Sequence, residues 1–335
     1  MNTRTVSRRH FLAQAAAGSA ALALGPSAFA QPDWPKQPIK LIVPYAPGGA
    51  NDVTLRLVSK HVAEKLGQPI IIDNRPGAGG VVGTNVVAKA APDGYTIGVG
   101  ATSTLIATPL TNPQSIVDVS RDLVFVSLLA VAPMVLAVNP SVPVKTAADL
   151  PQYLKEQKGK LSYGSMAVGH FGHVAIKELS DMYGAEMVHS PYKGEAPLVQ
   201  DLVGGQIQMA LVTPPSIRAM AEAGRVRLLA VTGTKRIKLF PDVPTFAEEG
   251  FDNPLFRMSA GWIGIVAPAG TPAAVVHRLE TEYSAAVHTP DVRQQLGELG
   301  LEPIGANAET FAATYAREKV VWRELLVKAG VEVKG

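Results

Sequence analysis

Short apolar runs alternate along the chain with segments whose apolar residues recur every three or four positions. Residues 39–43 (IKLIV) are the first apolar run. In residues 53–66 the spacing is three and four, through Leu55, Val58, Val62 and Leu66. A short apolar run is typical of a buried strand, and the second spacing places apolar side chains on one face of a helix.

The alternation continues with predicted strands at 69–72 and 95–100 and a helix at 81–90 between them. This order is typical of α/β proteins with a mainly parallel sheet, whose ligands bind beyond the carboxyl ends of the strands. Further strands are predicted at 161–165, 187–191, 207–212, 226–232 and 262–267, and helices at 171–183, 196–204, 272–288 and 308–329. A capping box at 146–149 predicts one more helix start.

Two regions of the pattern indicate a chain that leaves one lobe and returns to it. Residues 124–138 are rich in β-branched and apolar residues and are interpreted as strands that cross into a second lobe. The chain returns to the first lobe in the predicted strand at 262–267. We therefore expect one lobe from 31–130 plus 255–335 and a second from 131–254. Each is expected to be a mainly parallel sheet flanked by helices, with a hinge and a ligand cleft between the lobes.

The first 30 residues have the pattern of an export signal. Paired arginines in SRRHFL at 7–12 precede an alanine-rich apolar run, and Ala28-Phe29-Ala30 follows as a small-residue cleavage site. The paired arginines predict twin-arginine export to the periplasm, with cleavage after Ala30. The alternative, a membrane anchor, needs an apolar run of roughly 20 residues, which is longer than this one. The chain contains no cysteine, so we expect no lipid anchor.

Charge argues against nucleic acid and anionic membranes as partners. Three of the 31 basic residues lie in the predicted signal, which has no acidic residue, and the remaining 28 are balanced by 28 acidic residues. Both kinds of partner favour a basic surface. The absence of cysteine also excludes disulfides and thiolate chemistry.

The strongest candidate site is the glycine-rich turn at 44–52 (PYAPGGAND), between the first strand and the first helix. Gly48 and Gly49 allow backbone N–H groups to approach an anionic ligand at a helix N-terminus. A plain strand-to-helix turn is the alternative. Asp52 is interpreted first as a cap of the helix, because a carboxylate would repel an anion.

A second glycine-rich loop, 74–83 (NRPGAGGVVG), imitates a dinucleotide fingerprint with the wrong glycine spacing. It is a weak phosphate candidate, and Arg75 is expected to be solvated or structural. In the second lobe, 163–170 (YGSMAVGH) and 189–194 (HSPYKG) each follow a strand. There Tyr192 offers an aromatic wall, and Lys193 could pair with a carboxylate.

Catalytic and metal signatures are absent from the sequence. It has no Gly-x-Ser-x-Gly, no His-Glu-x-x-His and no phosphate loop. A triad of Ser165, His170 and Asp52 has no support in their spacing. His170 and His173 lack a third ligand nearby, so we expect neither a metal site nor a cofactor. We expect no enzyme.

Eight motifs in order resemble the Bug (TctC-like) receptors of tripartite tricarboxylate transporters, over essentially the whole chain after the signal. They lie at 45–52, 74–80, 92–95, 163–173, 191–194, 231–233, 241–245 and 267–272. The resemblance implies a two-lobed periplasmic binding protein of type II-like fold that holds a small carboxylate through backbone amides and hydroxyls. That carboxylate is a di- or tricarboxylate, an amino acid or an aromatic acid. It also implies delivery to membrane permease subunits after lobe closure, and we expect a monomer.

Carried onto this chain, the resemblance gives the ligand-binding candidates Tyr45, Gly48, Gly49, Thr102, Ser103, Ser165, Gly169, His170, Tyr192 and Lys193. Asp52 and Thr213 complete the set. The chain departs from the family pattern at Ala167, where glycine is usual, and at His170, where a small hydroxyl is usual. Residues 211–213 (LVT) stand where an aspartate is often found. His170 is therefore expected to add a charge-tunable donor. A periplasmic ligand sensor and a secreted hydrolase are the alternative functions.

Overall fold

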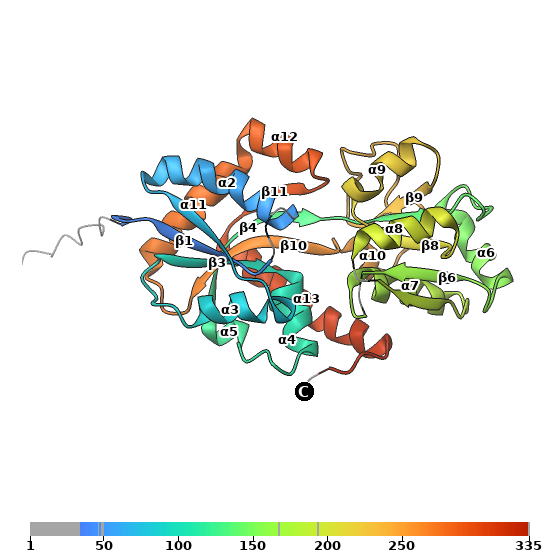
Figure 1. Ribbon diagram of the computed structural model, residues 1–335, viewed down its shortest axis with the longest axis horizontal. Coiled ribbons are helices and arrows are strands. Elements are labelled where there is room, and N and C mark those ends of the chain that lie inside the picture. Colours follow the sequence, from blue (N-terminus) through green and yellow to red (C-terminus); the bar gives the residue numbers. More distant parts are fainter. Residues whose placement is uncertain (1–33, 46, 48–49, 167, 193, 334–335) are drawn as a thin grey trace, which may run out of the picture. The chain divides into compact units, whose positions relative to one another are not determined.

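The computed structural model describes residues 34–333 except 46, 48–49, 167 and 193. The chain divides after Lys36, and Gln37–Gly335 forms one compact unit. It contains a six-stranded sheet in the order β11-β4-β10-β3-β1-β2 and a five-stranded sheet in the order β7-β6-β8-β5-β9 (Figure 1). We call each sheet with its packed helices the first and the second lobe. The signal segment 1–30 lies outside the described residues.

The first lobe begins with the predicted strand–helix alternation. β1 (Ile39–Val43) pairs in parallel with β2 (Ile70–Asn74) and β3 (Thr96–Ala101). Helix α2 (Ala50–Leu66) buries Leu55, Val58 and Val62, the spacing seen in the sequence. The other elements of this lobe are η1 (Ala78–Gly80), α3 (Val81–Ala88), η2 (Ser103–Ala107), α4 (Thr108–Thr111), α5 (Val119–Asp122), β4 (Leu123–Ala132), β10 (Gly261–Pro268), α11 (Ala273–His288), α12 (Pro290–Glu298), β11 (Glu302–Ala306) and α13 (Ala308–Lys328).

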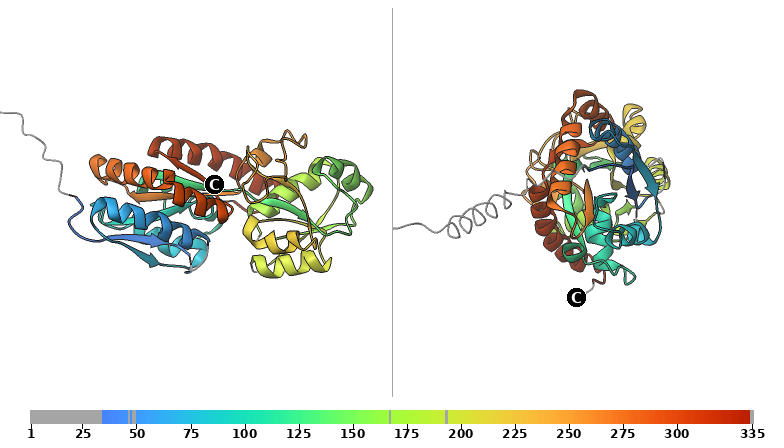
Figure 2. Two further views of the ribbon diagram at one scale, coloured as in Figure 1. Left: turned by 90° about the horizontal axis from the view of Figure 1, so that it is seen from above. Right: turned by 90° about the vertical axis from the view of Figure 1, so that its left-hand side faces the viewer.

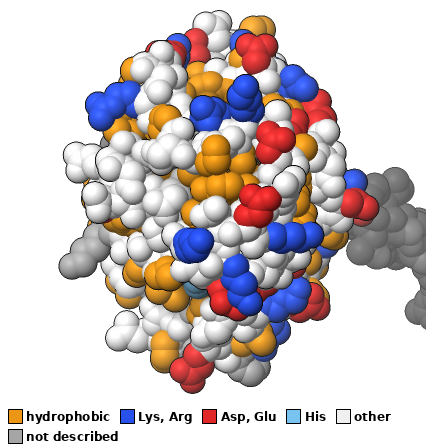
Figure 3. Space-filling view, turned by 90° about the vertical axis from the view of Figure 1, so that its right-hand side faces the viewer, with side chains coloured by type: hydrophobic (Ala, Val, Ile, Leu, Met, Phe, Trp, Pro, Cys, Tyr) orange, Lys and Arg blue, Asp and Glu red, His pale blue; other side chains and the backbone are white. Residues whose placement is uncertain are grey.

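The second lobe is built on β5 (Val135–Val138), whose neighbours are β8 (Met209–Val212) and β9 (Arg227–Val231). Helices lie on both faces of this sheet, as they do on the first (Figures 1 and 2). Its remaining elements are η3 (Ala147–Asp149), α6 (Leu150–Glu156), β6 (Ser162–Ser165), α7 (Phe171–Met182), β7 (Val188–Pro191), α8 (Glu195–Gly204), α9 (Pro214–Glu222) and α10 (Pro254–Arg257). The surface at the end of this lobe mixes basic and acidic side chains with apolar ones, in keeping with the balanced charge (Figure 3).

The prediction of mainly parallel sheets is corrected by the pairing. Strands joined by helical crossovers are parallel, but β10 runs antiparallel to β3 and β4, and β5 runs antiparallel to β8 and β9. The reason is that β4, β5, β9 and β10 carry the chain between the lobes, so their directions are set by the crossing. The sequence pattern also missed α9, α12 and β11, which are short and only partly buried.

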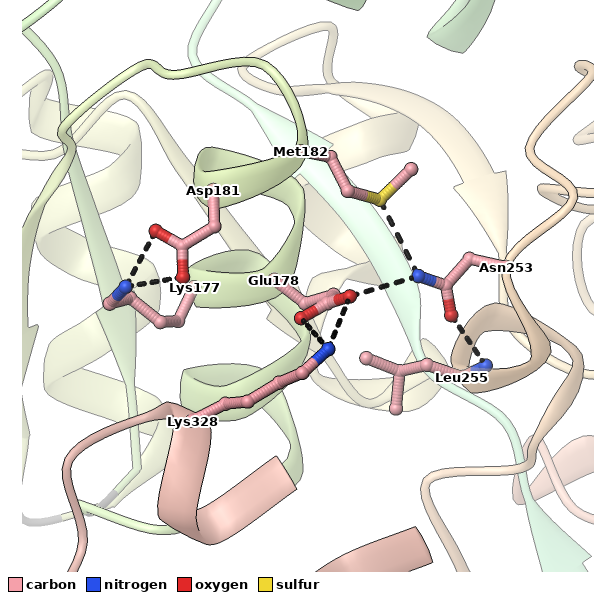
Figure 4. Close-up of polar contacts among 7 residues, drawn as sticks. All are labelled: Lys177, Glu178, Asp181, Met182, Asn253, Leu255 and Lys328. Carbon is pink, nitrogen blue, oxygen red and sulfur yellow. Dashed lines mark hydrogen bonds and ion pairs between the residues drawn. The ribbon is translucent and has the colours of Figure 1, made fainter. Parts of the chain in front are cut away.

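The last helix, α13, connects the two lobes. Its first half packs on the first sheet, where Phe311 and Tyr315 meet Phe125. Near its end the Lys328 ammonium lies 3.4 Å from the Glu178 carboxylate of α7, which also accepts a hydrogen bond from Asn253 at 3.1 Å (Figure 4). α13 therefore ties the first lobe to α7 and to the segment that enters β10. Within the described residues, no helix combines the length and the apolar character that crossing a membrane requires.

Candidate functional site

The loop after β1 is held in place by the start of α2 and by the end of β2. The Asp52 carboxylate accepts hydrogen bonds from Arg56 at 2.9 Å and from the Asn74 amide at 2.9 Å. The same Asn74 amide donates to the Tyr45 carbonyl at 3.1 Å. Asp52 is therefore a buried structural anchor of this loop. Gly48 and Gly49 lie outside the described residues.

The second glycine-rich loop packs against the first loop at Pro44. A Cβ at Gly83 would lie 2.9 Å from the Pro44 Cα and 3.0 Å from the Arg75 carbonyl oxygen, so only glycine fits there. Gly79 has φ +69° and its carbonyl accepts a hydrogen bond from Thr108 at 2.8 Å. The glycines thus serve turn geometry and close packing, which explains the resemblance to a nucleotide fingerprint without a phosphate.

The end of β3 brings a hydroxyl pair to the same region. The Tyr45 and Ser103 hydroxyls lie 2.8 Å apart, and burial raises the pKa of Tyr45. Thr102 is buried, and its hydroxyl accepts a hydrogen bond from the backbone N–H of Trp262 at 3.1 Å. This bond ties the end of β3 to the start of β10. The segment after β3 forms no long loop, because η2 begins at Ser103.

In the second lobe, Ser165 pairs with His189 rather than with His170. The Ser165 Oγ and His189 Nε2 lie 2.7 Å apart, and the His189 ring stacks on His173 with centroids 4.0 Å apart. Ser165 is 0% exposed, so its hydroxyl faces the protein interior. Burial, followed by the effect of His173, lowers the pKa of His189 to about 4.

His170 caps α7 and is held in one neutral form. Its Nδ1 accepts the Gly172 N–H at 3.2 Å, so the proton of the neutral ring is on Nε2. Burial, and secondarily His173, lowers its pKa to about 4. The expectation that His170 changes its charge near neutral pH is therefore wrong. At neutral pH His170 is an uncharged Nε2–H donor, because burial removes water from its ring.

Two other candidates of the second lobe contact acidic residues. Thr213 precedes α9, and its backbone N–H and its hydroxyl both donate to the Glu195 carboxylate, the hydroxyl at 2.8 Å. The Tyr192 hydroxyl donates to Asp201 at 2.8 Å. Lys193 lies outside the described residues.

A cavity of about 490 Å³ lies where these segments meet. Five of the predicted residues line it, namely Thr102, Ser103, Gly169, His170 and Thr213. Of the remaining candidates that the structure describes, Tyr45 reaches the wall through Ser103, while Asp52, Ser165 and Tyr192 are not among the lining residues. The cavity thus brings together strand ends from both lobes, as the strand–helix order predicts.

Sequence reasoning missed most of the lining. The polar residues it missed are Asn51, Thr108, Thr111 and Asn112. The apolar ones include Met134, Met166, Val168, Phe171, Trp262, Ile263 and Trp322. Asn51 could have been found, because it stands in the first motif at the start of α2. Trp322 could not, because it is distant in sequence and reaches the cavity only through the path of α13.

The described lining carries no Lys, Arg, Asp or Glu side chain. In the described part of the chain no three His, Asp or Glu side chains gather closely enough to hold a metal ion. The wall instead presents helix starts, at Asn51 of α2 and at His170 and Phe171 of α7. Helix N-termini carry partial positive charge and N–H donors, which suit an anionic group.

Comparison with known proteins gives the family. A family model described as "Tripartite tricarboxylate transporter family receptor" matches residues 54–331. The chain belongs to this family. The receptor is 37% identical over 295 residues to the UPF0065 protein in the tcbD-tcbE intergenic region of Pseudomonas sp. strain P51, which covers 88% of this chain and 87% of that protein. It is 32% identical over 302 residues to protein BugT of Bordetella pertussis, covering 90% and 92%.

Solved structures agree with this assignment. Rpa4515 of R. palustris, solved with adipate, is 32% identical to the receptor with a TM-score of 0.75, covering 89% of this chain and 99% of that one. MatC from Rhodopseudomonas palustris, solved with bound malate, is 29% identical with a TM-score of 0.70, covering 88% and 100%. The predicted family and the two-lobed α/β fold are thereby confirmed.

Proposed function

We propose that this chain is a periplasmic receptor that binds a small carboxylate in the cavity and delivers it to the membrane subunits of a tripartite tricarboxylate transporter. The observation that carries the proposal is the cavity wall, where helix starts of both lobes meet around a space with no charged side chain among its described residues. Family membership and relatives solved with adipate and malate support the carboxylate. The predicted signal at 1–30 supports export.

The energetics are sufficient without an arginine clamp. Micromolar affinity corresponds to about −8 kcal/mol. Hydrogen bonds to a charged group contribute roughly 1.5–3 kcal/mol each, so three or four reach that value before the cost of immobilising the ligand. The donors available in the described lining include the start of α2, with Asn51 and Ser103, and the Nε2–H of His170.

Delivery requires that the lobes, at 31–130 plus 255–335 and at 131–254, move as separate bodies. The chain crosses between the sheets in 133–134 and again in 232–260, which supports a hinge there. Since the chain has no cysteine, dyes on Lys60→Cys and Lys160→Cys would report the distance between the lobes. We expect energy transfer to rise when a bound acid is added.

The test of function is calorimetry of the purified protein with adipate, malate, citrate and benzoate, each beside its amide. We expect at least one acid to bind at micromolar concentration and its amide not to bind. The acid should be recovered unchanged after incubation. Hydrolysis of an amide to its acid during the incubation would instead favour the secreted hydrolase, for which the Ser165–His189 contact is the one geometric argument. Binding of amides and acids alike would contradict carboxylate recognition.

A further inference from the structure

The first-lobe wall of the cavity has a donor available for an anion. Asn51 stands in the first turn of α2 and lines the cavity, and its side-chain amide makes no hydrogen bond with another described residue. Ser103, at the start of η2, lines the same cavity, and its hydroxyl is hydrogen-bonded to the Tyr45 hydroxyl at 2.8 Å. An anionic group at this wall would meet a helix N-terminus, an amide and a hydroxyl.

The second-lobe wall is already satisfied by its own side chains. The start of α9 is occupied by the Glu195 carboxylate, which accepts from the backbone and the hydroxyl of Thr213. At the start of α7, the Gly169 N–H donates to His173 at 3.0 Å and the Gly172 N–H donates to His170. A second ligand carboxylate on this side would meet a resident carboxylate and a neutral imidazole.

Apolar side chains form the rest of the enclosure. The crossing at 133–134 contributes Pro133 and Met134, and β10 contributes Trp262 and Ile263. Helices α7 and α13 contribute Phe171 and Trp322, whose ring centroids lie 6.0 Å apart. Val168, on the second-lobe side, is 61% exposed. The Nε1 of Trp322 is buried without a hydrogen-bond partner, and one neutral donor does not compensate a buried carboxylate.

We propose that the ligand is a monocarboxylate with an uncharged, apolar body, aliphatic or aromatic, rather than a di- or tricarboxylate. Its carboxylate lies at the first-lobe wall by Asn51 and Ser103. Its body lies against the apolar residues named above and against Val168. A second carboxylate would lose its water against the apolar residues, because the N–H groups of Gly172 and Thr213 on the second-lobe wall are already paired and the described lining has no cation in their place. This inference rests on the proposed receptor function and narrows its ligand.

The test compares acids of equal length that differ in one carboxylate. Calorimetry of the purified protein with hexanoate against adipate, and with 4-methylbenzoate against terephthalate, gives two ratios of dissociation constants. We expect the monoacid to bind at least tenfold more tightly in one pair or both. Equal or tighter binding of the diacid in both pairs would overturn the inference and leave the carboxylate receptor intact. Binding of none of the acids, nor of malate and citrate, would overturn the proposed function itself.

A substitution on the second-lobe wall tests the reason for this selectivity. Val168→Lys places a cation where the second carboxylate of a diacid would lie, and we expect the ratio to move at least fivefold toward the diacid. Val188→Lys is the matched control, because Val188 belongs to the same lobe, is 59% exposed and is not among the lining residues. Its ratio should stay within twofold of the parent. A folded Val168→Lys protein with an unchanged ratio, checked by its melting temperature, would contradict the wall assignment.

Discussion

The two walls of the cavity differ in chemistry, although both lobes are built from strand–helix units. In the first lobe, α2 begins at the cavity with Asn51 uncommitted, and its acidic neighbour Asp52 is tied to Arg56 and Asn74. In the second lobe, the Thr213 N–H before α9 is paired with Glu195, and the Gly172 N–H in the first turn of α7 is paired with His170. A helix N-terminus is therefore not enough to predict an anion site, because the side chains around it decide whether its donors remain available.

The largest effect is expected from Asn51→Asp. The change is isosteric and suits the helix start, since an acidic residue there is stabilising. It places a negative charge where the ligand carboxylate is expected, and we predict about 100-fold weaker binding of the acid, or about 2.7 kcal/mol, by calorimetry.

The matched control is Asn307→Asp. Asn307 caps α13 by accepting the Thr310 N–H at 2.9 Å, a role that aspartate also fills, and it is not among the lining residues. Its affinity for the acid should be unchanged within twofold. Equal affinity for Asn51→Asp and the parent would show that the first-lobe wall does not receive the charge.

Alanine at two packed glycines, Gly83 in α3 of the first lobe and Gly164 in β6 of the second, compares how tightly the two lobes are packed. A Cβ at Gly83 meets the backbone of Pro44 and Arg75, whereas one at Gly164 meets the ends of the Ile207 and Tyr192 side chains. Side-chain ends can move more cheaply than backbone. Chemical denaturation should show Gly83→Ala losing about 2 kcal/mol of unfolding free energy and Gly164→Ala about 1 kcal/mol or less. The reverse order would contradict this picture of the loop after β1.

Acid should weaken the second lobe because three of its histidines are kept neutral. Burial lowers the pKa of His170 and of His189 to about 4 and lowers that of His173, so the unfolded chain binds their protons first. The stability that depends on keeping these histidines neutral is fully present above the ordinary histidine pKa of about 6.5. It is lost as the pH falls from there to about 4. Urea unfolding at pH 7.5 and 4.5 should show a loss of about 1 kcal/mol for each of His170 and His189, discounted for their partial exposure, with a further loss in the same direction from His173.

His189→Asn should reduce this acid dependence, since one of the protons is no longer taken up. His277→Asn is the control, because His277 is exposed on α11 of the first lobe, and it should leave the dependence unchanged. A flat urea midpoint between the two pH values in the parent protein would refute the prediction.

The smallest effect is expected at the contact between α13 and α7. Glu178 is 14% exposed and Lys328 63% exposed, so their ion pair should couple by only about 0.5 kcal/mol in a double-mutant cycle of Glu178→Gln and Lys328→Gln. Lys177 and Asp181 form a matched pair within α7 (Figure 4). Because Glu178 and Lys328 belong to different lobes, we expect their coupling to change on ligand addition and that of the matched pair to stay constant. Equal behaviour of the two pairs would argue against relative motion of the lobes.

The fold could be predicted further than the site. Periodicity placed β1, α2, β3, α7 and α8 nearly at their observed bounds, because burial of one face imposes a repeat that is visible locally. Ordered motifs gave the family. Periodicity could not predict the direction of β10, because that direction depends on where the chain returns to the first lobe. It also missed the short helices α9 and α12, whose apolar faces are narrow.

For the cavity, the sequence by itself determined which loops could carry polar groups, since glycine-rich turns such as 44–52 follow buried strands and Thr102 and Ser103 stand at a strand end. Only the tertiary structure decided which of those groups are available. Ser165 is paired with His189 and buried, the helix start beyond Thr213 holds Glu195, and Trp322 arrives from the last helix. The physical reason is that strand and helix formation depend on neighbours along the chain, whereas the solvation and pairing of a polar group depend on residues that folding brings to it from elsewhere.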